Sequence, residues 1–474
     1  MTCYAGVDIG TTTITAVVVD AESGLIRGAA TVPNATETTP AEMRKEGRSE
    51  WDGGRMVQLA AGALGEAVAG VEAVAGIGVT GQQHGMLLVG ADGEPIGPFV
   101  GWQDRRGLSA ADSGTGTYVD RMREAAAQAG ARGCRPTAGY LGTTLYWLKA
   151  NEQAPERPFT ACFMPDYTAG SLAGARPVTD PTDAAGSGLY DIYEGRWHTE
   201  LIESLGLSVD WLPEVRPSAS PVGGLSALLA ERVGLPEGVP VFAACGDNQA
   251  SFAGSVSDYS GTLLINIGTG GQLSVHMSQA DSTESLEARP YMDGAFLLVG
   301  AGLVGGRSYA WLRDLFREIG RAFFGGTGDE DLYAAMNALA EATLKGADGL
   351  RCEPLFTGTR KEPERRGLWE GAGTSNFSPG HMARALLEGV ATQFRDYYGE
   401  MEACGAGGRR RLVGAGNGIR KNRLLRDILQ EALGMPMAIP AHTEEAAYGA
   451  ALLAGVGDGY FSSFEDAGKV IRYD

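Results

Sequence analysis

Two turns rich in glycine and threonine, far apart in the chain, have the composition of phosphate-binding loops. The first spans Asp8–Thr13 (DIGTTT) after an apolar strand, and the second spans Asn266–Gly271 (NIGTGG). Glycine lets a backbone come close to a phosphate, and backbone N–H groups and threonine hydroxyls can donate to its oxygens. Either turn alone could be an ordinary hairpin in which threonine serves strand formation. Together they favour a nucleotide held by two lobes of one chain, and therefore phosphoryl transfer.

Two aspartates lie where a carboxylate could take part in such a transfer. Asp8 ends the strand before the first turn, where it could cap the turn or hold a hydrated Mg²⁺ ion. Asp247 follows another apolar strand, in Gly246–Gln249, where it could cap a helix that begins at Asn248. It could also act as a general base that takes the proton of a sugar hydroxyl as the phosphoryl group arrives.

Further polar segments follow strand ends. Gln82–Gly85 (QQHG) and Trp102–Arg105 (WQDR) combine amide, imidazole, indole and carboxylate groups, which suit a polyol with many hydroxyls and apolar C–H faces. The alternatives are a loop histidine with ordinary partners and a tryptophan in the core. The glycine-rich segment Gly414–Gly418 could let an adenine lie against the backbone, although a tight strand-to-helix turn explains it equally well.

Composition limits the classes of function. The chain has 474 residues, enough for roughly two to four domains, and a formal net charge of −19, which disfavours nucleic acid as a partner. The basic run Arg409–Arg411 is short and is expected at a solvated loop edge. The six cysteines are scattered without a zinc or redox spacing, and no signal peptide or membrane-spanning run is visible. We therefore expect a cytoplasmic protein with reduced thiols.

The elements that must position these groups follow the same plan twice, with hairpin strands first and helices later. Strands are expected at 4–9, 14–19, 25–32, 76–79, 262–267, 272–276, 295–301 and 412–413. Helices are expected at 55–70, 118–129, 143–151, 307–319, 330–344, 380–403 and 444–455. Residues 155–240 are expected to elaborate the first lobe. The predicted domains are 1–248, for sugar and phosphate, and 249–474, for the nucleotide.

Taken in order, these motifs resemble the FGGY family of carbohydrate kinases, within the actin and sugar-kinase superfamily, over nearly the whole chain. The matching segments are VDIGTTT, GQQHG, WQDRR, GDNQAS, NIGTGG, GAGNGIRKN and EEAAYGAALLAG. Gly367–Glu388 resembles the second family signature, from which Ala372 and Leu386 depart. Thr144–Lys149 resembles the first but lacks its usual lysine before the tryptophan. The resemblance implies an α/β fold of two actin-like ATPase (ribonuclease H-like) lobes with a cleft between them.

The resemblance also implies roles for individual residues, with ATP and Mg²⁺ as cofactors and a small-molecule sugar as substrate. Asp247 would be the catalytic base, and Asp8 would position Mg²⁺, through water. The residues expected to line the sugar pocket are Gln83, His84, Trp102, Asp104, Asp166 and Asn248. The residues expected to bind phosphate are Thr12, Thr13, Gly268 and Thr269, and those expected to bind adenosine are Gly414, Gly416 and Asn417.

Within the family, the chain resembles the ketose kinases most. Glycerol kinases carry an Arg-Glu pair after the glutamine of the first-lobe loop, whereas this chain carries His84 and Gly85 there. The run Gly139–Leu148 resembles the sedoheptulokinase form of its region, so sedoheptulose is the expected sugar and xylulose the alternative. Two other classes stay open, namely an actin- or chaperone-like ATPase and a sugar sensor without catalysis. No membrane or nucleic-acid partner is expected, and a homodimer is the expected assembly if the chain oligomerises.

Overall fold

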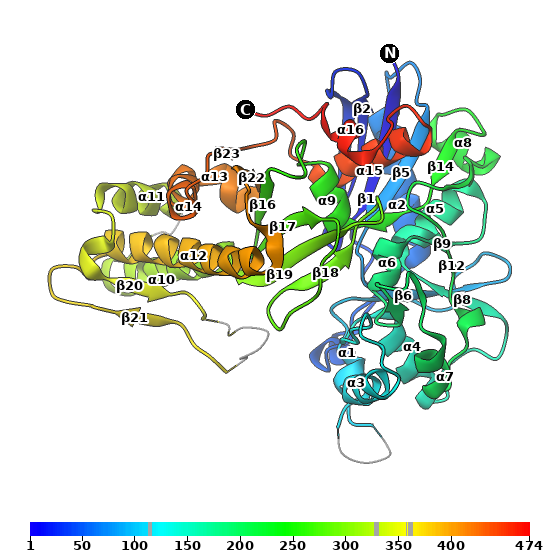
Figure 1. The fold of residues 1–474 in the computed structure, drawn as a ribbon, viewed down its shortest axis with the longest axis horizontal. Helices are drawn as coiled ribbons and strands as arrows, with labels where there is room; N and C mark the ends of the chain where they lie inside the picture. Colours follow the sequence, from blue (N-terminus) through cyan, green and yellow to red (C-terminus); the bar gives the residue numbers. More distant parts are fainter. Residues whose placement is uncertain (112–115, 327–330, 357, 359–363) are drawn as a thin grey trace. The chain divides into compact units, whose positions relative to one another are not determined.

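The computed structural model describes residues 1–111, 116–326, 331–356, 358 and 364–474. The chain divides into two compact units, which are drawn as a ribbon in Figure 1. Unit 1 comprises Met1–Ser257, Arg289–Ala295 and Glu444–Arg472, and unit 2 comprises Asp258–Ala288, Phe296–Thr443 and Tyr473–Asp474. The fold is that of two actin-like α/β units, as the motifs predict.

Unit 1 is built on a mixed sheet with the strand order β13-β14-β5-β1-β2-β3. The expected meander is present as antiparallel β1 (Cys3–Ile9), β2 (Thr13–Asp20) and β3 (Ile26–Pro33), while β5 (Gly76–Gly81) runs parallel to β1. The other two strands are β13 (Pro221–Gly224) and β14 (Pro240–Phe242). Side chains alternate across a strand, so the odd-numbered residues of β1 share a core with helix α2 (Gly53–Val68).

The opposite face of this sheet packs against helix α15 (Glu445–Gly457), which the sequence prediction puts in the second domain. A Cβ atom on Gly6 of β1 would lie 1.9 Å from the Ala447 carbonyl oxygen, so the strand and helix backbones are nearly in contact. The helix is apolar almost all round, and a helix of that kind must be buried. The C-terminal segment therefore returns to unit 1, and helix α9 (Asp247–Ala253) spans the predicted boundary at 248/249 within the same unit.

Residues 85–215 extend unit 1 with a second sheet and its own core, more of the chain than the predicted 155–240. The sheet has the order β4-β7-β6-β8, formed by Glu50–Trp51, Phe99–Gly101, Gly85–Gly90 and Phe159–Cys162. Its core is shared with helices α3 (Tyr118–Gln128) and α4 (Leu141–Ala150), through Met86, Met122 and Leu145 among others. Both helices confirm the sequence prediction to within two residues.

Unit 2 repeats the plan of unit 1. Its strands β16 (Thr262–Ile267), β17 (Gly270–Met277) and β19 (Phe296–Val304) are antiparallel, and β22 (Arg411–Ala415) and β23 (Met437–Ala438) continue in parallel beside β16. Helices α10 (Gly306–Phe324), α11 (Leu332–Ala342), α12 (Pro379–Met401) and α14 (Arg423–Leu433) share the core of this sheet. Helix α10 is five residues longer at its end than predicted. The duplication inferred from the sequence is confirmed.

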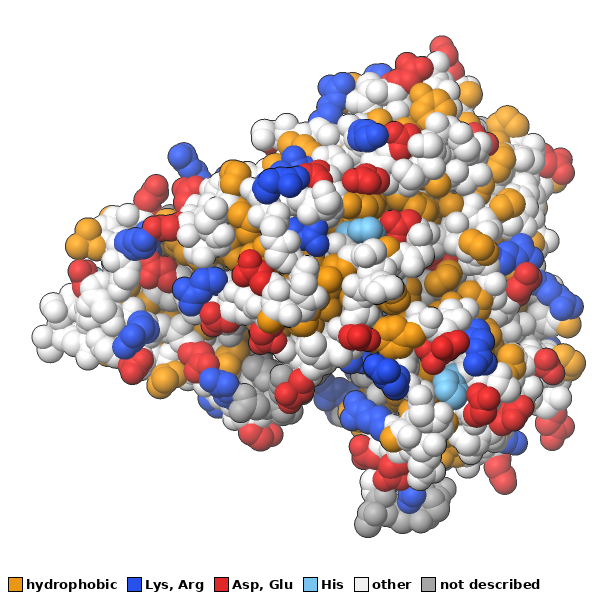
Figure 2. Space-filling model, in the orientation of Figure 1, with side chains coloured by type: hydrophobic (Ala, Val, Ile, Leu, Met, Phe, Trp, Pro, Cys, Tyr) orange, Lys and Arg blue, Asp and Glu red, His pale blue; other side chains and the backbone are white. Residues whose placement is uncertain are grey.

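Charge is dispersed over the surface. On the face drawn in Figure 2, lysine and arginine side chains lie singly or in small groups among acidic ones. Arg409 of the basic run donates to the carbonyl oxygens of Tyr259 and His276, so it ties the run to unit 2. Among the described residues, no helix has both the length and the apolar character needed to cross a bilayer.

Candidate active site

Three parallel strand ends bring the predicted catalytic groups of unit 1 to one edge of its sheet. Asp8 of β1 lies beside Thr80 of β5, and Thr80 lies beside Cys245 of β15 (Cys245–Gly246). Gln82–His84 and Asp247 directly follow β5 and β15, so these groups leave the sheet at the same edge. Ligands of open α/β sheets bind outside the carboxyl ends of the parallel strands, and this edge is therefore the candidate site in unit 1.

Asp8 and Asp247 are electrostatically coupled at this edge. Burial, and to a lesser extent the nearby carboxylates of Asp247 and Glu444, together raise the pKa of Asp8 to about 7. Burial also raises the pKa of Asp247. The backbone N–H of Asn248 and the charge of Arg289 lower this pKa, but the effect of burial is larger. The Asp247 side chain remains open to solvent although much protein surrounds it. An acid that is perturbed, accessible and placed at a strand end is typical of a functional site.

The first phosphate turn is held from behind by Asn34, a residue that the motif does not include. Asn34 donates its side-chain amide to the Gly10 carbonyl oxygen (2.9 Å) and its backbone N–H to the Thr12 carbonyl oxygen (2.9 Å). These bonds occupy carbonyl oxygens, and the Thr12 and Thr13 side chains are exposed. The turn can therefore present its hydroxyls to a ligand, as the sequence predicts.

Gln83 and His84 are both anchored to helix α6 (Pro181–Ala185) and the residue after it. Gln83 Nε2 donates to the Thr182 carbonyl oxygen (2.6 Å), and His84 Nδ1 lies 3.1 Å from the Gly186 carbonyl oxygen. A carbonyl oxygen only accepts, so Nδ1 carries the proton and Nε2 is the acceptor in the neutral ring. The ring stacks on Tyr140 at 4.0 Å between centroids, which fixes its plane. His84 is thus oriented for recognition, whereas the Gln83 amide nitrogen is already engaged.

Trp102 is 46% exposed and lies beside the phosphate turn, because its Nε1 donates to the Thr11 hydroxyl (3.0 Å). A Cβ atom on Gly139, which has φ of +78°, would lie 1.9 Å from the Trp102 carbonyl oxygen. Gly139 therefore allows the loop that carries Tyr140 to reach Trp102. An exposed, oriented indole is suited to the apolar face of a sugar, so the alternative of core packing is wrong for Trp102.

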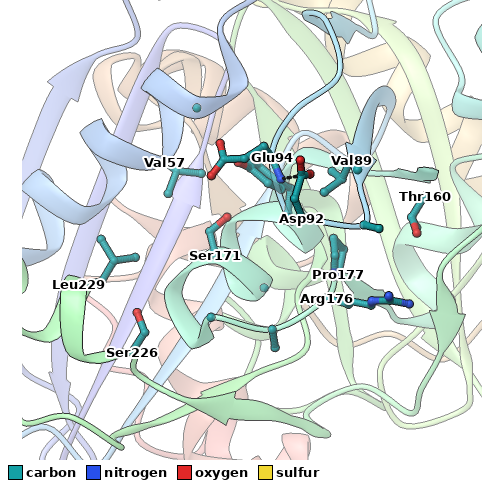
Figure 3. A pocket seen from close by; sticks show the side chains of 18 of the residues that line it. Val57, Val89, Asp92, Glu94, Thr160, Ser171, Arg176, Pro177, Ser226 and Leu229 are labelled. Carbon is teal, nitrogen blue, oxygen red and sulfur yellow. Dashed lines mark hydrogen bonds between the residues drawn. The ribbon is translucent and has the colours of Figure 1, made fainter. Parts of the chain in front are cut away.

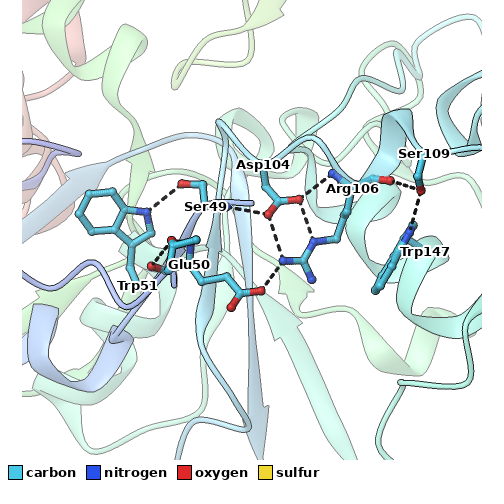
Figure 4. A network of polar contacts seen from close by, with 8 residues as sticks. Ser49, Glu50, Trp51, Asp104, Arg106, Ser109 and Trp147 are labelled. Carbon is cyan, nitrogen blue, oxygen red and sulfur yellow. Dashed lines mark hydrogen bonds and ion pairs between the residues drawn. The ribbon is translucent and has the colours of Figure 1, made fainter. Parts of the chain in front are cut away.

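Asp104, which is expected in the sugar pocket, is enclosed by partners from the protein itself. It is buried and accepts hydrogen bonds from Ser49 N, Arg106 N, Arg106 Nε and Arg106 Nη2, at 2.8–3.0 Å. Arg106 also donates to Glu50 (2.6 Å) and lies over the Trp147 ring, as Figure 4 shows. Both carboxylate oxygens of Asp104 therefore accept hydrogen bonds from within the protein. Its role is to hold Arg106 and the loop after Trp102.

Asp166, which is expected in the sugar pocket, lies inside the protein. It lies in helix α5 (Met164–Ala173) with no exposed surface, and neither carboxylate oxygen has a well-formed hydrogen bond among the described residues. Burial raises the pKa of Asp166 well above its usual range. By contrast, Asn248 follows Asp247 in the first turn of α9, and its buried Oδ1 lacks a partner in the described part of the chain. An unsatisfied amide oxygen beside Asp247 suits a ligand or a bound water.

Gln82 is a candidate that the sequence prediction leaves out. Its side chain is buried, and both amide atoms lack hydrogen-bond partners in the residues that the structure describes. Its backbone N–H donates to the Ile9 carbonyl oxygen (3.2 Å), so it lies next to the phosphate turn. The QQHG motif contains this residue, but spacing alone does not reveal which of the two glutamines is anchored.

The second phosphate turn opens onto a cavity of about 890 Å³ within unit 2. Gly268, Thr269 and Asn417 line it, as predicted, together with Tyr309 and Tyr333, which the sequence analysis missed. The two tyrosine rings are stacked, and the Tyr309 hydroxyl donates to Asn337 Oδ1 (2.7 Å). The turn itself is braced by α10, whose Gly306 and Arg307 N–H groups donate to the carbonyls of 268 and 269. The cavity therefore has hydrogen-bond donors at the turn and aromatic and aliphatic side chains along its walls.

Gly414 and Gly416 serve this cavity indirectly. A Cβ atom on Gly414 would lie 2.7 Å from Ile419 Cγ2, so this glycine permits strand-to-helix packing beneath the cavity. Gly416 has φ of +82°, and its Cβ would lie 2.5 Å from Asn266 Oδ1. Of the three predicted adenosine residues, only Asn417 is in the lining. Gly414 and Gly416 shape the turn that presents it.

A different hollow in unit 1, of about 1180 Å³, does not coincide with the catalytic edge. Figure 3 shows Asp92, Glu94, Ser171 and Arg176 around it, from the turn after β6 and from α5 and the segment after it. Its described lining contains none of the predicted site residues. This hollow is therefore separate from the candidate site at the strand ends.

Comparison with known proteins divides the chain into two contiguous domains, the second of which includes the first part of the C-terminal segment that packs in unit 1. The N-terminal domain model of the FGGY family of carbohydrate kinases matches residues 3–254, and the C-terminal domain model matches residues 263–457. Glycerol kinase of Alkalilimnicola ehrlichii is 30% identical over 480 residues, covering 96% of this chain and 90% of that protein. Xylulose kinase of Rhodospirillum rubrum has a similar structure, with a TM-score of 0.85 and 25% identity, covering 100% of this chain and 93% of that one.

Proposed function

Because the chain belongs to the FGGY family of carbohydrate kinases, we propose that it transfers the γ-phosphoryl group of ATP to the terminal primary hydroxyl of a ketose. The observation that carries this proposal is the shared strand edge of unit 1. It gathers a phosphate turn, an accessible acid at Asp247 and an oriented imidazole at His84. A nucleotide-bound conformational ATPase would need the first of these but not the other two.

Asp247 is proposed as the general base. It is accessible to solvent and begins a helix at the strand edge, where it can accept the proton of the attacking hydroxyl. Thr12, Thr13, Gly268 and Thr269 are proposed to donate to phosphate oxygens, and the unit 2 cavity is proposed to hold adenosine. Most of the rate enhancement then comes from alignment of donor and acceptor and from charge neutralisation.

The acids present fit a hydrated Mg²⁺ ion better than a cation enclosed by protein ligands. No group of three or more His, Cys, Asp or Glu side chains suited to a metal occurs in the described residues. Mg²⁺ commonly keeps several waters and takes one or two carboxylates together with substrate phosphates. Asp8, whose pKa of about 7 reflects burial and neighbouring carboxylates, would hold such an ion through water, and the ion would neutralise phosphate charge.

A ketose is favoured over glycerol by the loop after β5. The Arg-Glu pair of glycerol kinases is replaced by His84 and Gly85, and the side chains of His84 and its neighbour Gln83 are anchored to residues 182–186. The contact with Gly186 fixes the orientation of the His84 ring, so the ring can offer a hydrogen bond in one direction. Sedoheptulose is the first sugar proposed, from the resemblance of Gly139–Leu148, and xylulose is the second, supported by the likeness to xylulose kinase of Rhodospirillum rubrum.

The test is a coupled ADP-release assay with sedoheptulose, xylulose, ribulose, fructose and glycerol, followed by NMR of the product. We expect a ketose to give the highest kcat/KM and its phosphate to be on the terminal carbon. The Asp247→Asn variant should bind that sugar normally and lose about 10²-fold or more in kcat, as expected for a lost general base. Preference for glycerol would refute the ketose assignment, and near-normal turnover of Asp247→Asn would remove the proposed base.

A further inference from the structure

The peptide group that precedes Asp247 is held at both ends by buried threonine hydroxyls. The Thr80 hydroxyl donates to the Cys245 carbonyl oxygen (2.7 Å), and the Gly246 N–H donates to the Thr182 hydroxyl (2.8 Å). This carbonyl and this N–H belong to the peptide plane that joins Cys245 to Gly246, one residue before the first residue of α9. Both threonines have 0% exposed surface.

The hydroxyl of Thr182 has a fixed direction. It donates to Asp180 Oδ1 (2.6 Å), so its lone pairs are left to face the Gly246 N–H. Asp180 Oδ1 also accepts the backbone N–H groups of Thr182 and Asp183, at 2.9 Å each. The Ser218 hydroxyl donates to the other oxygen of Asp180. The acceptor for Gly246 is therefore oriented by a rigid network rather than by a rotating hydroxyl.

The same residue anchors the sugar loop through its backbone. The Thr182 carbonyl oxygen accepts the Gln83 amide (2.6 Å), and a Cβ atom on Gly246 would lie only 3.0 Å from the Gln83 side chain. Thr182 thus contacts both the peptide before the proposed base and the loop that carries His84. Its hydroxyl serves the first contact and its carbonyl serves the second, so a side-chain change can separate them.

We propose that Thr182 is a positioning residue that sets the direction of the Asp247 carboxylate through the 245–246 peptide, an inference that rests on the proposed function of Asp247. With valine at 182, the peptide loses the acceptor for its N–H and is held by Thr80 alone. A displacement of about 1 Å at a reacting group can cost on the order of 10²-fold in rate. The sugar loop keeps its anchor, because the 182 carbonyl is unchanged.

The experiment compares Thr182→Val with Thr182→Ser and with Thr168→Val. Thr168 is an equally buried threonine of unit 1, and its hydroxyl donates to the Met164 carbonyl oxygen within α5. For Thr182→Val we expect kcat to fall about 10- to 100-fold, with sugar and ATP KM within about threefold of wild type. Sugar affinity from calorimetry should be unchanged. Thr182→Ser should restore kcat to within about threefold, and Thr168→Val should leave it unchanged.

Each outcome decides the proposal. Unchanged kcat in Thr182→Val, equal losses in Thr168→Val, or failure of serine to rescue would overturn the positioning role while the proposed function stands. Absence of any sugar phosphorylation by the wild type would overturn the proposed function and this role together. If Thr182→Val does not fold, Ser218→Ala supplies the test, because Ser218 is only partly buried. Loss of its bond to Asp180 should lower kcat about three- to tenfold, and an unchanged kcat would overturn the role.

Discussion

Replacement of Asp104 by asparagine should affect stability far more than sugar binding. The wild-type carboxylate accepts four hydrogen bonds, from Ser49 N and from three nitrogens of Arg106, and its side chain has 0% exposure. Asparagine keeps the shape of the side chain but removes its charge. It also replaces one acceptor oxygen by an NH₂ group, which would then face an N–H donor of Ser49 or Arg106. Arg106, whose side chain is only 6% exposed, would then keep only Glu50 as a charged partner.

The magnitude follows from the burial of both partners. Breaking a buried ion pair by removing one charge costs about 3–5 kcal/mol, because the remaining charge is left uncompensated. Glu50 is partly exposed and still pairs with Arg106 at 2.6 Å, which favours the lower end of this range. For a unit of this size, about 1 kcal/mol corresponds to roughly 2–4 °C in Tm, so a decrease of roughly 6–12 °C is expected.

Two measurements distinguish this role from sugar binding. Thermal unfolding of the ligand-free protein should show the lower Tm, and steady-state kinetics well below that Tm should give a sugar KM within about threefold of wild type. The double variant Asp104→Leu/Arg106→Met should lose less stability than the two single variants together, because it removes both charges. A wild-type Tm with a sugar KM raised tenfold or more would refute this reasoning and restore Asp104 as a sugar ligand.

Three further variants test other parts of the structure. Asp8→Asn should raise the Tm of the ligand-free protein more at pH 8 than at pH 5: since the folded pKa of Asp8 is about 7 and its unfolded pKa about 4, the wild type loses stability as pH rises from about 4 through 7. An equal gain at both pH values would contradict this. Gly449→Ala would place a Cβ 1.9 Å from the Ala250 carbonyl oxygen and should cost about 1–3 kcal/mol or more in denaturant unfolding, whereas Gly62→Ala, with open space around it, should be neutral or stabilising. Thr269→Val should raise the KM for ATP several-fold and leave the sugar KM unchanged; the reverse pattern would remove the unit 2 turn from nucleotide binding.

The features that sequence predicts best here are local. The two phosphate turns join adjacent antiparallel strands, so strand, turn and hydroxyls all lie within one short segment. The helices α3, α4 and α12 have their predicted positions because their apolar periodicity is read within each segment alone. Placement of Asp247 beside Asp8 also follows, once both are assigned to carboxyl ends of parallel strands.

The features that sequence does not predict depend on partners far along the chain. The C-terminal helix α15 returns to unit 1 because small residues of β1, β5 and α9 let the backbones come close. Gly78 is one of these, since its Cβ would lie 1.9 Å from the Ala450 carbonyl oxygen. Asp104 has the residue type of a sugar ligand, but Ser49 and Glu50, more than fifty positions earlier, complete the network that encloses it with Arg106. A motif reports which groups are present and not which are already bonded.

This distinction bears on sugar preference. Gln83 stands where xylulokinases and sedoheptulokinases carry methionine, and an added amide suggests an added contact to sugar. The structure instead commits the amide nitrogen of Gln83 to the Thr182 carbonyl, so the replacement fastens the loop to the network that holds the 245–246 peptide. Under the proposed function, we expect discrimination among ketoses to come from other polar or exposed groups at the strand edge, namely His84, Trp102 and Asn248, and from Gln82, whose amide atoms lack partners among the described residues. Substitution of these residues should therefore change the order of preferred sugars, whereas Gln83→Met should change turnover with little effect on that order.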